Sequence, residues 1–223
     1  MFEIVRSLPA PIDLSRRKYN TAPIVEALSE ICFEKCYLCE NDKVQEVEVE
    51  HFLPHSNHPT LKFVWENLFY SCKRCNRIKG DNYEYILNPC DVNHKVFRNI
   101  LVIAPSRAND PVTVTNLCPT TDPNFDSAVR TVELLNRCFN DTSTPARKIS
   151  RRELINQLLE ELSLMLEIRG RLRSKRLTPF EEGQEIDRLK NMTSPQYPFS
   201  AFWRWQVLDD DILLSKMQNY INF

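Results

Sequence analysis

The chain has 223 residues, of which 42% are hydrophobic and 26% are charged, and its formal net charge is −1 at pH 7. This length and composition are typical of a soluble protein with a real core, and they exclude fibrous and largely disordered classes. No apolar run reaches the roughly 18 residues of a membrane span, and the first residues lack the order of a signal peptide. We therefore expect a cytoplasmic protein.

The first elements predicted in chain order precede a group of cysteines. Residues 1–22 are predicted to form an irregular N-terminal arm, with a short edge strand at residues 2–5. From Pro23 onward, apolar residues recur at helical spacing. Because proline is favoured in the first turn of a helix, this pattern predicts a helix that leads into the first cysteine pair.

Two Cys-x-x-Cys pairs follow, Cys36 with Cys39 and Cys72 with Cys75. Four thiolates in such pairs bind Zn²⁺ tetrahedrally, in a closed site that holds structure together rather than reacting. The missing signal peptide argues against disulfides, and a chance pairing of core cysteines is the alternative. The sequence therefore predicts a structural Zn²⁺ site. The four remaining cysteines are predicted to be small buried apolar groups.

The segment between the two pairs is predicted to form a ββα element together with the residues that follow it. Residues 44–52 have the composition of short β structure, and residues 54–59 form a polar, proline-rich loop. Residues 65–69 have apolar side chains at helical spacing and lead to the second pair. Residues 76–79 are expected to continue as a helical turn.

The C-terminal part, residues 96–223, is predicted to be mostly helical after a stretch of short strands and loops. Its clearest helix is expected to begin at Ser150, which forms a capping box with Glu153. A second box is expected at Thr178, and Asp209 is a candidate cap for the last helix. The aromatic run from Phe199 to Trp205 has the composition of a core segment or a protein interface, more often than that of a base-stacking platform.

Polar residues around the second cysteine pair carry the candidate chemistry. Histidine has an unperturbed pKa near 6.5, which suits His51 to deprotonating water. A carboxylate and an amide oxygen are hard ligands that suit Mg²⁺ or Mn²⁺ better than a second Zn²⁺. Four cations between Asn67 and Gly80 are expected either to contact phosphates or to form a solvated helix face. These cations are Lys73, Arg74, Arg77 and Lys79.

The residues around the cysteines also resemble a known family. Glu50-His51, Asn67-Leu68 and Cys75-Asn76-x-x-Lys79 resemble the HNH, or ββα-metal, endonucleases. More narrowly, the motifs His51-Phe-Leu-Pro-His and Leu87-Asn-Pro are similar to the PtuB-type nuclease subunits of Septu anti-phage defence systems, which also occur with some retrons. The resemblance covers about residues 32–90.

This resemblance implies roles for individual residues. His51 would be the general base, Glu50 and Asn76 the ligands of a catalytic metal ion, and Asn67 the brace of the loop between the strands. The family more often has Asp or His at the first ligand position and His at the last. His55 is a reserve ligand or phosphate contact, although loop residues are the simpler interpretation of both His55 and His58.

Together these observations predict an α+β, mostly helical protein with a zinc-stapled ββα-metal module at residues 23–95 and a C-terminal region at residues 96–223 that docks a partner. The expected activity is metal-dependent hydrolysis of phosphodiester bonds in DNA or RNA. The resemblance implies a partner ATPase of the ABC or SMC-like PtuA type, and for retron systems a reverse transcriptase. The alternatives are a zinc-finger module that only binds nucleic acid or a partner, and a mainly structural subunit of a defence complex.

Overall fold

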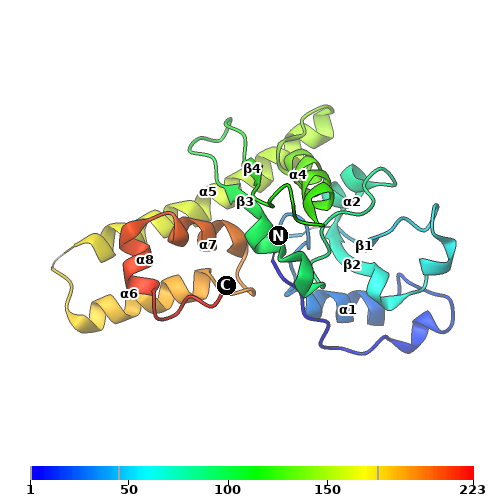
Figure 1. Cartoon of the computed structure of the whole chain (residues 1–223), viewed down its shortest axis with the longest axis horizontal. Helices are drawn as coiled ribbons and strands as arrows, with labels where there is room; N and C mark the ends of the chain where they lie inside the picture. The colour runs from blue at the N-terminus through cyan, green and yellow to red at the C-terminus, as the bar shows by residue number, and fades with distance from the viewer. Residues whose placement is uncertain (1, 45, 175) are drawn as a thin grey trace.

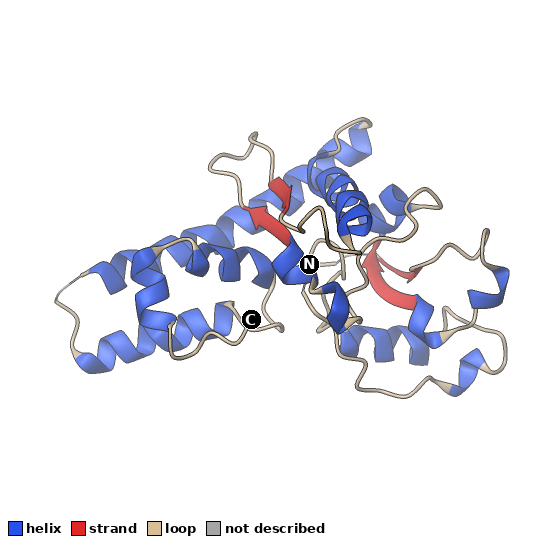
Figure 2. Cartoon of the chain, in the orientation of Figure 1, coloured by secondary structure: helices blue, strands red, loops and turns tan. Residues whose placement is uncertain are grey.

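The computed structural model describes residues 2–44, 46–174 and 176–223, and most of its regular structure is helical (Figures 1 and 2). The α-helices are α1 (Ala22–Ile31), α2 (Lys73–Lys79), α3 (Val96–Asn99), α4 (Phe125–Asn140), α5 (Pro145–Arg173), α6 (Pro179–Met192), α7 (Ser200–Leu208) and α8 (Asp211–Met217). The strands are β1 (Val47–His51), β2 (Leu68–Cys72), β3 (Ile100–Ile103) and β4 (Thr113–Asn116). The predicted α+β class with a helical C-terminal region is confirmed. Within the described ranges, no helix has the length and apolarity needed to cross a bilayer.

The ββα element is formed by β1, β2 and α2. β1 pairs antiparallel with β2, in a register that places His51 opposite Leu68 and Val47 opposite Cys72. α2 follows β2 directly, and the Cys72 thiol caps it by accepting a hydrogen bond from the Cys75 N–H. The predicted helix at residues 65–69 was wrong, because a single 3₁₀ turn at Trp65–Asn67 runs straight into β2. Short apolar runs fit buried strands as well as helices, and here pairing with β1 decides.

The N-terminal arm packs on the core without forming the predicted strand at residues 2–5. Phe2 and Ile4 are buried, and the Ile4 N–H donates to the Pro89 carbonyl at 2.8 Å. One such hydrogen bond to a loop does not make a strand ladder. The arm then runs through a 3₁₀ turn at Ile12–Leu14 to α1, which begins with proline in its first turn as predicted.

The C-terminal region joins the ββα element through α4 and extends away from it through α5 (Figure 1). α4 packs against α2 and β4. α5 begins near the end of α4 and forms a long arm with α6, and α7 and α8 lie along this arm. The predicted short strands near residues 100 and 113 are confirmed as β3 and β4, which pair antiparallel. Residues 96 and 97, expected in a strand or loop, belong to the short helix α3.

Two of the three predicted helix caps were misplaced. α5 begins at Pro145, and the Thr144 hydroxyl caps it by accepting from the Arg147 N–H, so Ser150 lies inside the helix. Proline at the first helical position favours this earlier start. α8 is capped by Asp210 instead of Asp209. The capping box at Thr178 and Glu181 is present as predicted.

The aromatic run at residues 199–205 forms α7 and belongs to the core. The Trp203 side chain is 1% exposed, and its indole N–H donates to the Pro198 carbonyl at 2.8 Å. The indole N–H of the half-buried Trp205 donates to the Ile100 carbonyl at 2.9 Å and ties α7 to β3. These contacts favour the core interpretation of the run over the interface interpretation, because both indole N–H groups are bonded inside the chain.

We expect Trp203→Ala to lower the free energy of unfolding by about 3–5 kcal/mol, since it leaves a large cavity in the core. Chemical denaturation of the purified chain measures this change. Phe180→Ala is the control, because that ring is 73% exposed and its loss should change the free energy by less than about 0.5 kcal/mol. Equal unfolding midpoints for Trp203→Ala and the wild type would contradict the core assignment.

Candidate active site and zinc centre

The four paired cysteines form a cluster with metal-ligand geometry. Their Sγ atoms all lie within 4.8 Å of one another, and the Cys39 and Cys72 Sγ atoms are 3.9 Å apart. Zn–S bonds of about 2.3 Å in a tetrahedral site separate the sulfurs by about 3.8 Å. The donors therefore fit the predicted structural Zn²⁺. Such an ion would fasten the start of α2 to the turn that follows α1.

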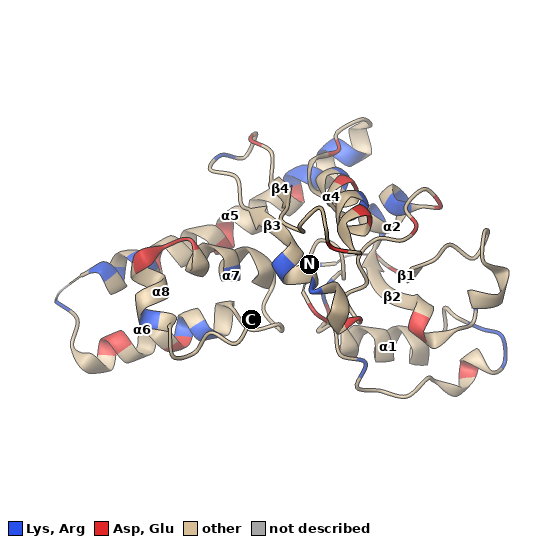
Figure 3. Ribbon diagram, viewed as in Figure 1, with Lys and Arg blue, Asp and Glu red and all other residues tan. Residues whose placement is uncertain are grey.

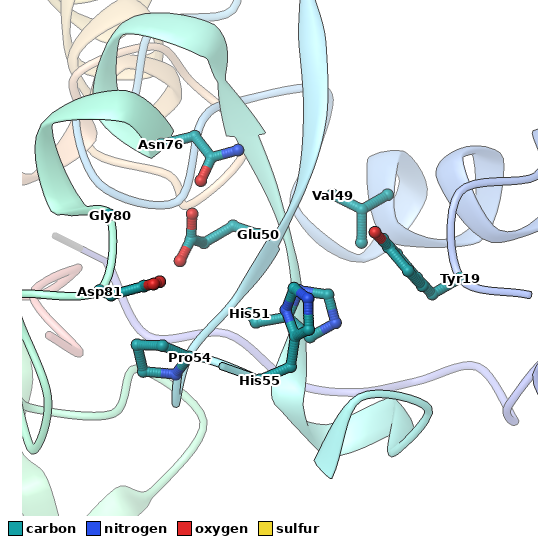
Figure 4. A pocket seen from close by; sticks show the side chains of 9 residues that line it. All are labelled: Tyr19, Val49, Glu50, His51, Pro54, His55, Asn76, Gly80 and Asp81. Carbon is teal, nitrogen blue, oxygen red and sulfur yellow. The ribbon is translucent and has the colours of Figure 1, made fainter. Parts of the chain in front are cut away.

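A polar pocket of about 200 Å³ opens beside the end of β1 (Figure 4). Its lining comes from the arm before α1, from β1 and the loop after it, and from α2 and the residues that follow. The lining residues are Tyr19, Val49, Glu50, His51, Pro54, His55, Asn76, Gly80 and Asp81. The fold thus brings together three of the residues predicted for catalysis, Glu50, His51 and Asn76.

His51 is buried at the end of β1, with its ring held in one orientation. The His51 Nε2 lies 3.0 Å from the Lys62 carbonyl oxygen. A carbonyl oxygen only accepts hydrogen bonds, so Nε2 carries the proton and Nδ1 keeps its lone pair. Burial lowers the pKa of His51 to about 4, although the hydrogen bond to Lys62 opposes this shift. The imidazole is therefore neutral at pH 7 and able to accept a proton.

Asn67 lies outside the pocket lining and fixes the loop that follows β1. Its side-chain oxygen accepts from the Leu53 N–H at 2.8 Å, and its amide nitrogen donates to the carbonyls of Leu53 and Leu61 at 2.9 and 3.3 Å. All three contacts hold the segment between His51 and β2. This is the loop-bracing position that the resemblance implies.

Glu50 and Lys79 form a buried ion pair behind the pocket. The Lys79 ammonium donates to a Glu50 carboxylate oxygen at 2.6 Å and to the His51 carbonyl at 2.9 Å, and the Lys79 side chain is 0% exposed. Burial raises the pKa of Glu50 to about 7, and the charge and hydrogen bond of Lys79 oppose this shift. The sequence suggested that Lys79 contacts a phosphate. Because its ammonium is buried, Lys79 instead positions Glu50 and the backbone of His51.

Asn76 and Asp81 add oxygen atoms to the same side of the pocket as Glu50 (Figure 4). The Asn76 amide nitrogen donates to a Glu48 carboxylate oxygen at 2.7 Å, which turns the amide oxygen toward Glu50. Asp81 accepts a hydrogen bond from the Ser56 hydroxyl at 2.8 Å. These carboxylate and amide oxygens are a donor set that suits Mg²⁺ or Mn²⁺. Asp81 lies six positions after Cys75, directly after Gly80, a position that could have identified it in the sequence.

The other predicted phosphate contacts on α2 are mostly occupied by protein groups. The Arg74 guanidinium donates to the carbonyls of Cys138, Asp141 and Arg147 and to the Ser150 hydroxyl, each at 2.8 Å. These four bonds clamp α2 to the junction between α4 and α5, so Arg74 is a structural residue instead.

Lys73 and Arg77 are not bound to backbone carbonyls as Arg74 is, and Arg77 is the more exposed of the two. Lys73 forms an ion pair with Glu46 near the surface. Arg77 is exposed to solvent at the end of α2. Arg77 is therefore the α2 cation that is best placed to reach a phosphate.

Replacing Lys79 with methionine should destabilise the protein by about 3–5 kcal/mol, because the mutation leaves the Glu50 carboxylate buried without its partner. Urea denaturation monitored by circular dichroism checks this value. Lys73→Met is the matched control, since it removes a cation from the same helix. The Lys73 side chain is 36% exposed, so we expect little change in the free energy of unfolding. Equal effects of the two mutations would contradict a special role for the buried pair.

Two aromatic residues complete the pocket around His51. The His55 ring lies 4.4 Å from the His51 ring, and the Tyr19 ring meets His51 edge-on at 4.8 Å. Tyr19 was not predicted, because it comes from the arm before α1 and only the fold brings it to the pocket. His58 lies outside the lining and pairs with Glu84 at 3.4 Å, as suits a loop residue.

Two comparisons with known proteins agree with this geometry. Residues 36–82 match the model of the HNH endonuclease family. A segment of 69 residues is 45% identical to the Septu protein PtuB of Bacillus thuringiensis, covering 28% of this chain and 27% of that protein. The chain therefore contains an HNH endonuclease domain built on the cysteine pairs and the ββα element. The match spans about a quarter of the length of that relative.

Proposed function

We propose that the protein is a metal-dependent endonuclease that hydrolyses phosphodiester bonds in DNA or RNA as the effector of a Septu-type anti-phage defence complex in the cytoplasm. The observation that carries the proposal is the convergence of Glu50, His51 and Asn76 on one pocket at the end of β1. The HNH domain and the relative in a Septu system support the same chemistry and setting.

The pocket residues divide the work of hydrolysis. His51 accepts a proton from water at Nδ1 while Nε2 stays bonded to the Lys62 carbonyl. The water oxygen bonds to phosphorus, one ester P–O bond breaks, and the departing oxygen takes up a proton from solvent. A phosphate beside His51 favours the imidazolium, which offsets the effect of burial on the pKa of His51.

Glu50 and Asn76 would hold the catalytic Mg²⁺ or Mn²⁺, with Asp81 as a neighbouring carboxylate. When bound, this ion supplies positive charge to the scissile phosphate and the departing oxygen. Lys79 keeps the Glu50 carboxylate in place at 2.6 Å, and Glu48 keeps the Asn76 amide oriented. The partner that this proposal implies is an ATPase of the PtuA type, with a reverse transcriptase in retron systems.

Incubation with plasmid DNA and with RNA, in Mg²⁺, Mn²⁺ or EDTA, tests the proposal, using the chain by itself and together with its ATPase. We expect cleavage that EDTA abolishes. Glu50→Gln and Asn76→Ala should shift the Mg²⁺ titration to higher concentration while bound zinc stays at the wild-type level. Nucleic acid bound but left intact under every condition would instead favour a zinc-finger binding module.

A further inference from the structure

We propose that the arm at residues 16–19, together with Lys62, is a nucleic-acid-binding wall of the pocket, which contacts substrate phosphates next to the scissile bond. This inference rests on the proposed nuclease function and assigns the substrate contacts of that site. The sequence placed the substrate contacts on α2, whereas most of them would lie on the opposite side of the pocket.

Tyr19 fastens the arm to the pocket. Its ring lines the pocket and contacts the rings of His51, His55 and Phe63 at 4.8, 6.1 and 6.1 Å between centroids. Figure 4 shows Tyr19 reaching the pocket from the arm, on the side away from Asn76 and Asp81. An aromatic contact therefore holds the arm against His51, although the arm and His51 are distant in the sequence.

The cations of this wall are not paired with acids of the chain that the structure describes. Arg16, Arg17 and Lys18 are exposed, and neither they nor Lys62 forms an ion pair with any residue in the described ranges. The Lys62 ammonium lies 5.6 Å from the ring centroids of both Tyr19 and Phe63.

The arm and the loop after β1 thus present their cations together. The Arg17 guanidinium lies 5.7 Å from the Phe63 ring centroid, on the same ring that Lys62 approaches. Figure 3 shows this basic stretch on the loop that precedes α1. The nearby Asp13 instead accepts a hydrogen bond from the Thr21 hydroxyl.

The opposite wall is poorer in available positive charge. On α2, Lys79 is buried against Glu50, Arg74 binds backbone carbonyls, and Lys73 pairs with Glu46. Arg77 is the exposed cation that α2 keeps for a phosphate, against three exposed cations on the arm. A nucleic-acid strand whose scissile phosphate lies in the pocket has further phosphates on both sides of the scissile one. Since unpaired Lys and Arg release counterions when they contact phosphates, the arm is where flanking phosphates gain most.

Binding of fluorescein-labelled single-stranded and double-stranded oligonucleotides, of DNA and of RNA, tests this assignment. The full chain is kept without Mg²⁺ or Mn²⁺, so that nothing is cut and the His51 ring that Tyr19 contacts stays in place, and the slope of log Kd against log salt is measured. Arg16→Gln with Lys18→Gln should weaken binding and reduce the slope by about 1 for each lost phosphate contact, about 2 for the pair. The control is Arg173→Gln with Arg176→Gln, two exposed cations at the far end of α5 and the turn after it, and we expect the wild-type slope.

Tyr19 variants supply a second readout of the same assignment. Tyr19→Ala should reduce the salt slope as the arm variant does, because the arm loses its contact with the pocket. Tyr19→Phe should keep the wild-type slope, because the ring makes the contacts.

Several outcomes would overturn the assignment while leaving the nuclease proposal intact. One is an active enzyme whose arm variant keeps the wild-type salt slope, and another is an equal loss in the control pair. An arm variant that binds nucleic acid normally but no longer co-purifies with the ATPase would make the wall a protein interface instead. Conversely, arm-dependent binding without any cleavage would support the wall and contradict the nuclease proposal.

Discussion

His51→Ala should lower the cleavage rate by roughly 10²–10⁴-fold while the protein stays folded and keeps its zinc. The mutation removes the Nδ1 that would take the proton of the attacking water. It leaves the cysteine cluster untouched, and among the described residues the side-chain hydrogen bond that it removes is the one to the Lys62 carbonyl. Initial rates with plasmid and with RNA substrates, alongside circular dichroism and zinc analysis, measure the effect.

His58→Ala is the matched control for this experiment. It removes an imidazole from the same loop, but this ring pairs with Glu84 and does not line the pocket. We expect near wild-type rates for this variant. A folded His51→Ala protein that cleaves as fast as His58→Ala would show that another group is the base.

The ββα element and its cysteine pairs could be predicted from the sequence because their residues lie close together along the chain. The cysteine pairs and Glu50-His51 have fixed spacings within one ββα element, and metal and strand geometry demand these spacings. The pocket consequently contains Glu50, His51 and Asn76 as the motif suggests.

The sequence was insufficient where tertiary contacts decide the role of a side chain. Four basic residues on α2 look alike in the sequence, yet Lys79 is buried against Glu50 and Arg74 binds the carbonyls between α4 and α5. Tyr19 reaches the pocket only because the arm folds back over the loop after β1. Burial also decides that Trp203 belongs to the core, because aromatic composition alone fits a core segment and an interface equally well.

The cysteine cluster and the pocket share α2, so the cluster bears on the geometry of the pocket without contributing a lining residue. Cys72 and Cys75 define the start of α2, whereas Asn76 and Lys79 occupy its next turn. Lys79 in turn holds Glu50 and the His51 carbonyl. An α2 that is no longer fastened to the turn after α1 would therefore misplace the ligands in the pocket.

Cys72→Ser should abolish stoichiometric zinc binding, lower the thermal stability sharply and remove cleavage as a consequence. Structural Zn²⁺ contributes on the order of 10–16 kcal/mol of apparent binding free energy in zinc-finger peptides, which is comparable to the whole stability of a domain. Serine is a good helix cap, so the cap that the Cys72 thiol provides for α2 should survive the mutation. The loss would then come from the metal site. Zinc analysis and thermal unfolding of the purified variant measure both effects.

Cys90→Ser is the control, because Cys90 is half-buried and lies outside the cluster. We expect it to keep its zinc and most of its stability. Treating the wild type with a strong zinc chelator should reproduce the Cys72→Ser behaviour, since both remove the same fastening of α2. A Cys72→Ser protein with the zinc content and melting temperature of Cys90→Ser would show that the four cysteines do not form a metal site. The positions of Asn76 and Lys79 would then depend on the Arg74 clamp and on the β1–β2 pairing instead.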